Sequence, residues 1–190
     1  MWDEVELTIK DQRGGIVLKR REDFHFVAGA WTELQAIWSK LSLSPPQFRE
    51  VELSAQEAGW VFEWWVSEAF RLSGAEVQSP FTVRIATSLV EEIDGAVFTP
   101  FGAFLVECKF QEAKVTIEPI VKLRSQLERR PPGTMGIIFS KSGFTEEAVI
   151  LLSHLSPCNV LLFSGDDIEL MQRRPDSMVE ALRIKYRAAV

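Results

Sequence analysis

Asp94, Glu107 and Lys109 are the three residues whose types could together do hydrolytic chemistry. Glu107 and Lys109 are two positions apart in a run of β-forming residues, so their side chains project from the same face of a strand. A second such run carries Asp94, and residues Thr99 to Gly102 between the two runs are typical of a hairpin turn. Antiparallel pairing of the two strands would bring the Asp94 carboxylate beside Glu107 and Lys109.

These groups predict metal-dependent hydrolysis of a phosphate ester. The carboxylates of Asp94 and Glu107, with the backbone carbonyl of Cys108, supply the hard oxygen ligands that Mg²⁺ prefers, and Mn²⁺ could substitute for it. A bound metal ion acidifies a water and neutralises phosphate charge, while Lys109 would orient that water or stabilise the developing charge. The alternative is that Glu107 and Lys109 form an ordinary ion pair on the solvent face of a strand.

At these residues the sequence resembles the PD-(D/E)xK nuclease superfamily, the restriction-endonuclease-like proteins, and within it the Mrr-like branch. The segment from Glu92 to Gly95 matches the aspartate motif, with Ile93 in place of the proline, and Glu107-Cys108-Lys109 matches the (D/E)xK motif. The resemblance extends to a preceding helix with Glu63 and to the later stretches Gly136 to Ser140 and Gly143 to Thr145. The order of these pieces is more specific than any one of them.

The resemblance implies a fold, an activity and roles for individual residues. It implies an Mg²⁺-dependent endonuclease that hydrolyses phosphodiester bonds in DNA, with restriction or phage defence as its biological role. Asp94 and Glu107 would be metal ligands, Lys109 would be catalytic, and Glu63 would reach the metal site from its helix. RNA remains open as a substrate, and a homodimer would be compatible with cutting a duplex at two active sites.

Two other functions compete with this interpretation. The fold could serve as a noncatalytic nucleic-acid-binding or protein-assembly module, which a net charge of −6 and six tryptophans would favour. Residues Ser140 to Thr145 could instead bind a nucleotide phosphate at a helix N-terminus, although they lack the glycine-rich P-loop pattern with its lysine. The three intact residues Asp94, Glu107 and Lys109 favour the nuclease.

The helix expected from Glu118 to Arg129 carries candidates for nucleic-acid contacts. Lys122, Gln126 and Arg129 share one of its faces, and Lys114 lies in the linker before it. A polar, cationic stripe directly after the catalytic strand could follow a phosphate backbone, whereas the alternative is an ordinary solvated helix face.

The order of elements predicts an α/β protein with a mixed central β-sheet flanked by helices. Residues 53–190 would form the restriction-endonuclease-like core, in which the capping box at Ser54 opens a long helix ending at Gly74. Residues 1–52 would be an N-terminal extension, with a hairpin over residues 4–19 and a helix from Trp31 to Leu41. Its tryptophans are expected either to pack or to form a binding surface.

Cysteine content and hydropathy predict a cytoplasmic protein. The two cysteines make neither a disulfide framework nor a metal-binding pair. The first six residues lack the character of a signal peptide, and no apolar run is long enough to span a membrane.

Overall fold

The computed structural model describes residues 27–48, 51–78, 80–85, 88–154, 159–173 and 177–189. The hairpin expected over residues 4–19 lies outside them. The described helices are α1 (Trp31–Leu41), α2 (Ala55–Leu72), α3 (Ile117–Leu127), α4 (Glu146–His154), α5 (Gly165–Met171) and α6 (Ser177–Ala189). The strands are β1 (Gln47–Phe48), β2 (Val51–Glu52), β3 (Glu76–Gln78), β4 (Phe81–Ile85), β5 (Ser88–Ile93), β6 (Gly95–Thr99), β7 (Gly102–Lys109), β8 (Met135–Ser140) and β9 (Val160–Phe163).

A five-stranded mixed sheet forms the centre, in the order β3-β6-β7-β8-β9. The first three strands run antiparallel to their neighbours, whereas β7, β8 and β9 are parallel. Parallel neighbours need a crossover, and α3 supplies it between β7 and β8, as α4 does between β8 and β9. The predicted mixed sheet flanked by helices is therefore confirmed, as is the β6–β7 hairpin with Thr99 opposite Gly102.

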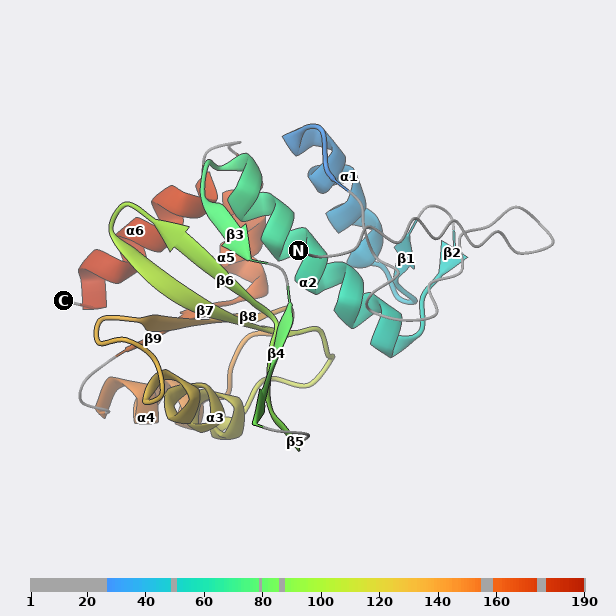
Figure 1. Cartoon of the computed structure of the whole chain (residues 1–190). Coiled ribbons are helices and arrows are strands. Elements are labelled where there is room, and N and C mark those ends of the chain that lie inside the picture. Colours follow the sequence, from blue (N-terminus) through green and yellow to red (C-terminus); the bar gives the residue numbers. More distant parts are fainter. Residues whose placement is uncertain are drawn as a thin grey trace.

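Helices cover both faces of this sheet, so each face is buried (Figure 1). On one face α2, α5 and α6 pack in a large apolar cluster, and α1 lies against the outer side of α2. On the other face α3 and α4 enclose a smaller cluster around Leu105, Ile120, Leu123 and Ile138. Strand β7 contributes to both clusters, because alternate side chains point to opposite faces. None of the described helices is long and apolar enough to cross a membrane.

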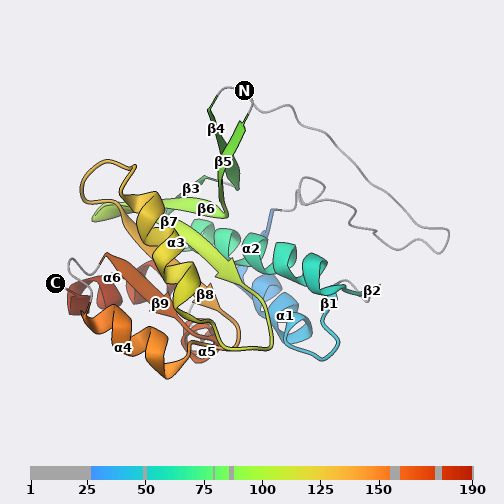
Figure 2. The same ribbon diagram turned by 90° about the horizontal axis from the view of Figure 1, so that it is seen from below.

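Asp94 lies where a long β-ribbon leaves the sheet. Strands β3 and β6 pair within the sheet, whereas β4 and β5, which continue them, form a separate two-stranded sheet. This second part projects from the body of the molecule (Figure 2). The single strand expected from Glu92 to Phe98 is wrong, because β5 ends at Ile93, the chain bends at Asp94 and β6 starts at Gly95.

Helix α2 begins where it was predicted to begin, but more of its circumference is buried than the single apolar stripe that was expected. Ser54 and Glu57 form the expected capping box, and Gly74 follows the helix with a φ of 85°. Glu68 was expected to be exposed, but it is buried, with only 8% of its surface accessible. The buried arc is wide because the sheet covers one side of α2 and α1 covers another.

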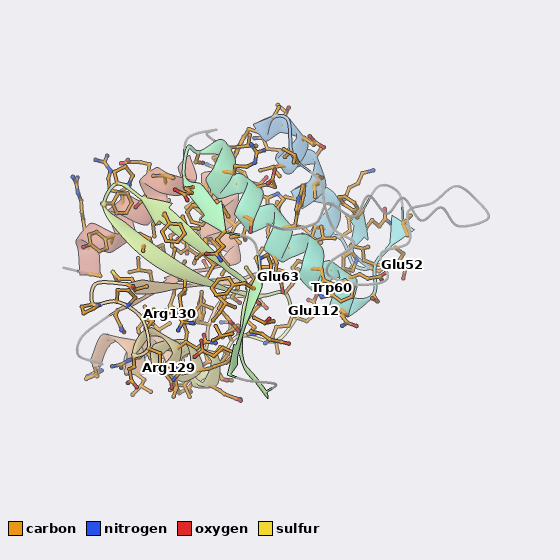
Figure 3. All side chains as sticks on the ribbon, in the orientation of Figure 1. Glu52, Trp60, Glu63, Glu112, Arg129 and Arg130 are labelled. Atoms are coloured by element: carbon orange, nitrogen blue, oxygen red, sulfur yellow. The ribbon has the colours of Figure 1, made fainter. Side chains whose placement is uncertain are left out.

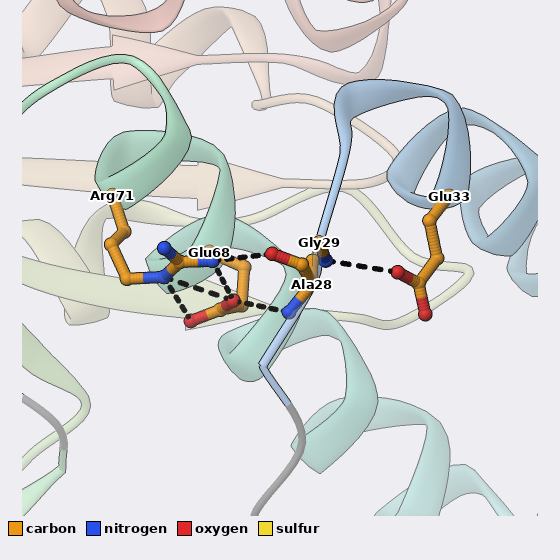
Figure 4. A network of polar contacts seen from close by, with 5 residues as sticks. All are labelled: Ala28, Gly29, Glu33, Glu68 and Arg71. Atoms are coloured by element: carbon orange, nitrogen blue, oxygen red, sulfur yellow. Dashed lines mark hydrogen bonds and ion pairs between the residues drawn. The ribbon is translucent and has the colours of Figure 1, made fainter.

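Glu68 links α2 to the segment before α1 (Figure 4). Its carboxylate accepts a hydrogen bond of 2.7 Å from the backbone N–H of Ala28 and forms an ion pair of 2.8 Å with Arg71. Arg71 also donates to the carbonyl of Ala28. Its hydrogen bond to Glu68 and the negative charge of Glu68 raise the pKa of Arg71 above its usual value, although burial lowers it. The pair therefore fixes the chain entry to α1.

Helix α1 has the predicted bounds, and its tryptophans pack rather than form a binding surface. Trp31 and Trp38 are 6% and 7% exposed, and both rings lie against Trp65 of α2. The Trp65 indole N–H donates to the carbonyl of Leu34 at 2.8 Å, which satisfies its buried polar group. Trp2 lies outside the described residues.

Gly136 in β8 determines how closely α3 approaches the sheet, and its replacement is the first test of the packing. A Cβ atom at this position would lie 2.5 Å from Cδ2 of Leu123, which is itself buried. Gly136→Ala is therefore expected to lower the free energy of unfolding by about 1–3 kcal/mol, measured by urea denaturation.

Gly59 in α2 provides the matched control for this substitution. Nothing lies within 4 Å of a Cβ placed there, so Gly59→Ala is expected to raise the free energy of unfolding by about 0.5–1 kcal/mol. Equal effects of the two substitutions would contradict the close packing of α3 on β8.

Candidate active site

Asp94 and Glu107 lie opposite each other at the neighbouring ends of β6 and β7. Gly95 pairs with Val106, so the next residues in the antiparallel register are Asp94 and Glu107. Oδ2 of Asp94 accepts a hydrogen bond of 2.9 Å from the backbone N–H of Cys108. The structure thus brings Asp94 beside the Glu107-Cys108-Lys109 segment, and the bend after Ile93 aims its carboxylate back at β7.

The Glu107 carboxylate is buried and binds two lysines. Glu107 is 2% exposed, and its Oε1 lies 2.6 Å from Nζ of Lys109 and 3.4 Å from Nζ of Lys122. A buried carboxylate retains its charge at acceptable cost only when cations or hydrogen-bond donors surround it. The alternative of an ordinary ion pair on a solvent-exposed strand face is therefore wrong for Glu107, because α3 covers this face of the sheet.

Lys109 is a cation in this site. Burial lowers the pKa of Lys109, but the Glu107 charge, its hydrogen bond to Lys109 and the Asp94 charge together raise that pKa above its usual value. The side chain therefore carries a full positive charge at neutral pH. It can donate hydrogen bonds and neutralise negative charge, but it cannot accept a proton.

Cys108 points into the core between these two charged residues. Burial raises the pKa of the Cys108 thiol well above its usual value, and the negative charges of Asp94, Glu63 and Glu107 raise it further. The thiol is therefore neutral, which excludes it as a nucleophile. The charge of Glu63 therefore acts on the same point of β7 as the charges of Asp94 and Glu107.

Glu63 reaches this region from α2, on the opposite face of the sheet from α3 (Figure 3). It is partly buried. One turn further along α2, Oγ of Ser67 lies 3.9 Å from the position that a Cβ of Gly95 would occupy, so this face of the helix lies over the start of β6. Among the described residues, no three acidic, histidine or cysteine side chains lie together as a ready metal site.

The predicted polar stripe of α3 exists, but it faces the strands. Lys122 contacts Glu107, and Nε2 of Gln126 lies 3.4 Å from the backbone carbonyl of Glu92. Arg129, expected as the last residue of this helix, lies two residues beyond the end of α3 at Leu127 and binds Glu91. Gln126 was predicted to face phosphate or solvent together with the cations, yet it is 2% exposed, and its Oε1 has no hydrogen-bond partner within the described residues.

Lys114 lies apart from this stripe, exposed in the loop between β7 and α3. No ion pair joins it to another residue of the described part of the chain. Its predicted contact with nucleic acid, like those of Lys122, Gln126 and Arg129, stays a prediction.

Glu91 is a residue of this region that the sequence did not single out. Its side chain is 3% exposed and forms ion pairs with Arg129 and with Arg130, which lies 2.5 Å away. Burial by itself raises the pKa of Glu91, but hydrogen bonds from Arg130 and Arg129 and their charges lower it to below the usual value. The base of the β4–β5 ribbon is thereby fixed to α3, three residues before Asp94.

The loop from Ser140 to Thr145 is not built to attract a phosphate. The hydroxyl of Ser140 is buried and donates to the carbonyl of Gly143 at 2.8 Å, while Thr145 caps α4 through the N–H of Ala148. Glu146 and Glu147 occupy the first turn of α4. Two carboxylates at a helix N-terminus cancel the positive potential that would bind an anion, which disfavours the nucleotide interpretation.

The residues of this site lie within a segment that a known family matches. A family model described as restriction endonuclease, the Mrr catalytic domain, matches residues 55–171, which is more than half of the chain. The chain belongs to the Mrr-like restriction endonuclease family. The resemblance inferred from the sequence motifs is therefore confirmed, and with it the restriction-endonuclease-like fold of the mixed sheet.

The solved structures to which this chain is similar are distant in sequence. Protein VC1899 from Vibrio cholerae has a TM-score of 0.51 and 11% identity, and the match covers 82% of this chain and 43% of that one. The DNA modification-dependent restriction endonuclease AspBHI has a TM-score of 0.45 and 15% identity, and the match covers 93% of this chain and 47% of that one. The MspJI restriction endonuclease, solved with a 27-mer oligonucleotide, has a TM-score of 0.42 and 16% identity, and the match covers 88% of this chain and 38% of that one.

The likeness to these structures concerns the fold alone. This Mrr-like chain spans less than half of the length of each of the three proteins. No curated protein sequence matches it. The predicted boundary between residues 52 and 53 stays a prediction, although α1 and α2 share one apolar cluster.

The ion pairs of Glu91 predict how stability depends on pH. The pKa of Glu91 is lower in the folded protein than in the unfolded chain, so its contribution is complete above the unfolded value of about 4.3 and is lost as the pH falls through the folded value. Glu91→Gln is expected to lower the free energy of unfolding by about 1–3 kcal/mol at pH 7, and by progressively less below about pH 4.

Urea denaturation of both proteins from pH 7 to pH 3 measures this difference. Glu128→Gln, at an exposed position beside Arg129, is the control and is expected to change stability by less than about 0.5 kcal/mol. A Glu91→Gln deficit that stayed constant over the whole pH range would contradict the ion-pair origin.

Proposed function

We propose that this Mrr-like protein is a metal-dependent endonuclease that hydrolyses phosphodiester bonds in DNA. The observation that carries the proposal is the buried Glu107 carboxylate, which lies opposite Asp94 and binds Lys109 within the segment of the family match. Burying a charged group is costly, and a fold without use for that charge could place an apolar side chain there instead. Restriction or phage defence is the proposed biological role, and the cytoplasm is the proposed location.

Asp94 and Glu107 are the proposed ligands of Mg²⁺ or Mn²⁺, together with the Cys108 carbonyl. The donor set fits such an ion, because two carboxylate side chains converge at adjacent strand ends, and Mg²⁺ commonly uses only one or two carboxylates of the protein. When bound, the ion would acidify a water and neutralise charge on the phosphate. Glu63 is proposed as an auxiliary ligand or positioning residue on the α2 side.

Lys109 stabilises negative charge on the reacting phosphate in this proposal. Its raised pKa keeps the ammonium protonated, so it donates hydrogen bonds to the developing charge or to the attacking water and does not act as a base. Lys114 and Arg129 are proposed to contact the nucleic-acid backbone, and Gln126 to contact a phosphate or a water. The protein could act as a homodimer on a duplex.

A noncatalytic nucleic-acid-binding or assembly module is the second candidate. The acidic total charge favours its protein-assembly form, because a protein held on DNA by charge alone would carry a positive net charge. The two candidates differ in what Lys109→Ala would do. It would abolish cleavage by a nuclease, whereas a noncatalytic module that remained folded would keep its binding.

DNA cleavage by purified protein tests the proposal directly. Supercoiled and single-stranded DNA would be incubated with the protein and Mg²⁺ or Mn²⁺, beside Lys109→Ala and Asp94→Asn proteins prepared identically. Cleavage is expected for the parent only, with a loss of about a hundredfold or more in each variant and complete inhibition by EDTA. Cleavage that persisted in both variants would place the activity elsewhere, and its absence from the parent would favour the binding module.

The auxiliary role of Glu63 has its own measurement. Glu63→Gln is expected to reduce the cleavage rate by about tenfold to a hundredfold, less than Asp94→Asn, because it keeps both strand carboxylates. Glu112→Gln is the control, since Glu112 is 85% exposed and pairs only with Lys141 among the described residues. A Glu63→Gln protein with normal stability and the parental rate would exclude Glu63 from the site.

A further inference from the structure

Two lysines from different elements share one oxygen of Glu107. Lys109 extends from the same strand and lies at 2.6 Å, whereas Lys122 reaches across from α3 and lies at 3.4 Å. The side chain of Lys109 is 30% exposed and that of Lys122 is 52% exposed. Lys109 is therefore the tightly held partner, and Lys122 is the partner that water can replace at little cost.

The two lysines already balance the charges of the two strand carboxylates in the absence of a bound cation. The carboxylates of Asp94 and Glu107 carry two negative charges, and the ammonium groups of Lys109 and Lys122 carry two positive charges. A divalent ion beside the two carboxylates would add two further positive charges within a few ångströms of the lysines. Because like charges at that separation repel, the more weakly held ammonium should leave Glu107 when the ion binds.

The backbone of α3 allows the head of Lys122 to move without moving the helix. Four residues after Lys122, Gln126 is buried against β5, and Leu123 is buried against the sheet. These contacts fix the helix, while the long side chain of Lys122 can swing its ammonium over several ångströms. A released ammonium at this position would remain close to the carboxylates of Asp94 and Glu107.

We propose that Lys122 is a displaceable counter-ion of Glu107: it competes with the metal ion for the carboxylate in the free protein and, once displaced, neutralises a phosphate oxygen of the substrate. This inference rests on the proposed metal-dependent nuclease function. It assigns Lys122 a role that differs from that of Lys109, which stays on Glu107, and from that of a general backbone contact.

The proposal predicts that loss of the Lys122 charge raises the metal affinity but lowers the maximal cleavage rate. Removing the charge of Lys122 should strengthen metal binding to the DNA-free protein, because Glu107 loses a competitor. It should also lower the maximal cleavage rate at saturating metal, because one cation no longer reaches the phosphate. A merely structural ion pair would predict the reverse for the metal, since loss of support for Glu107 would weaken its binding.

Mn²⁺ binding to the full chain without DNA is the deciding measurement, with free Mn²⁺ followed by electron paramagnetic resonance. Lys122→Met is expected to bind Mn²⁺ about threefold to fivefold more tightly than the parent, the range of a solvent-screened ion pair. Lys122→Arg retains the charge and should bind like the parent. Arg124→Met removes one charge from another face of α3 and should change the affinity by less than about twofold.

The outcomes separate this inference from the function on which it rests. If the parent binds no Mn²⁺, or if Asp94→Asn binds as well as the parent, the proposed metal site fails and the inference fails with it. If the parent binds at Asp94 but Lys122→Met binds equally or more weakly while remaining folded by circular dichroism, only the counter-ion role is overturned. Tighter binding by Lys122→Met, together with a lower maximal cleavage rate, would support it.

Discussion

A carboxylate that is 2% exposed can keep its charge only if cations bind it, and Glu107 imposes this condition at the centre of the fold. Lys109 meets it from the same strand and Lys122 from α3. Strand β7 must therefore end beside α3, and α3 must turn a polar face toward the sheet. The close approach of α3 over Gly136 follows the same requirement, since a side chain on β8 would push the helix away.

Two other buried carboxylates follow the same rule and join other parts of the chain. Glu91 binds Arg129 and Arg130 and so fixes the β4–β5 ribbon to α3, while Glu68 binds Arg71 and Ala28 and fixes the segment before α1 to α2. In both cases arginine, with its planar fork of donors, satisfies most of the carboxylate oxygens. Glu107 differs, because lysines bind a single oxygen of its carboxylate. This looser arrangement suits the proposed exchange of Lys122 for a metal ion at the Glu107 carboxylate.

Local patterns in the sequence were sufficient for the elements that bury one regular face. The two β-rich runs around a turn predicted the β6–β7 hairpin, and helical spacing predicted α1 from Trp31 to Leu41. The hairpin turn also predicted that Asp94 would approach Glu107. These features depend on residues within a few positions of each other, or on one turn, so the sequence contains nearly all the information needed.

The burial of Glu68, Glu91 and Gln126 could not be predicted in this way. Glu68 pairs locally with Arg71, but its other partner, the backbone of Ala28, lies 40 positions away, and the partners of Glu91 and Gln126 lie 34 to 39 positions away. A charged or amide side chain is assigned to solvent by default, because burying it alone is unfavourable. Only the packing of α3 and α2 supplies the compensating groups. The bend at Asp94 was missed for a related reason, since β-forming residues continue through it and the change of sheet is a tertiary feature.

The acidic total charge does not describe the surroundings of the site. Lys109 lies on β7, Lys122 lies on α3, and Arg129 and Arg130 follow the end of α3, while the net charge of −6 belongs to the whole chain. Four carboxylates, those of Glu63, Glu91, Asp94 and Glu107, offset these four positive charges, so the free protein has little net attraction for an anion here. Any ligand that draws Glu107 away from Lys122 would expose more positive charge at that point. A cation and a phosphate would then favour each other's binding, because coupling of this kind is reciprocal between the two ligands.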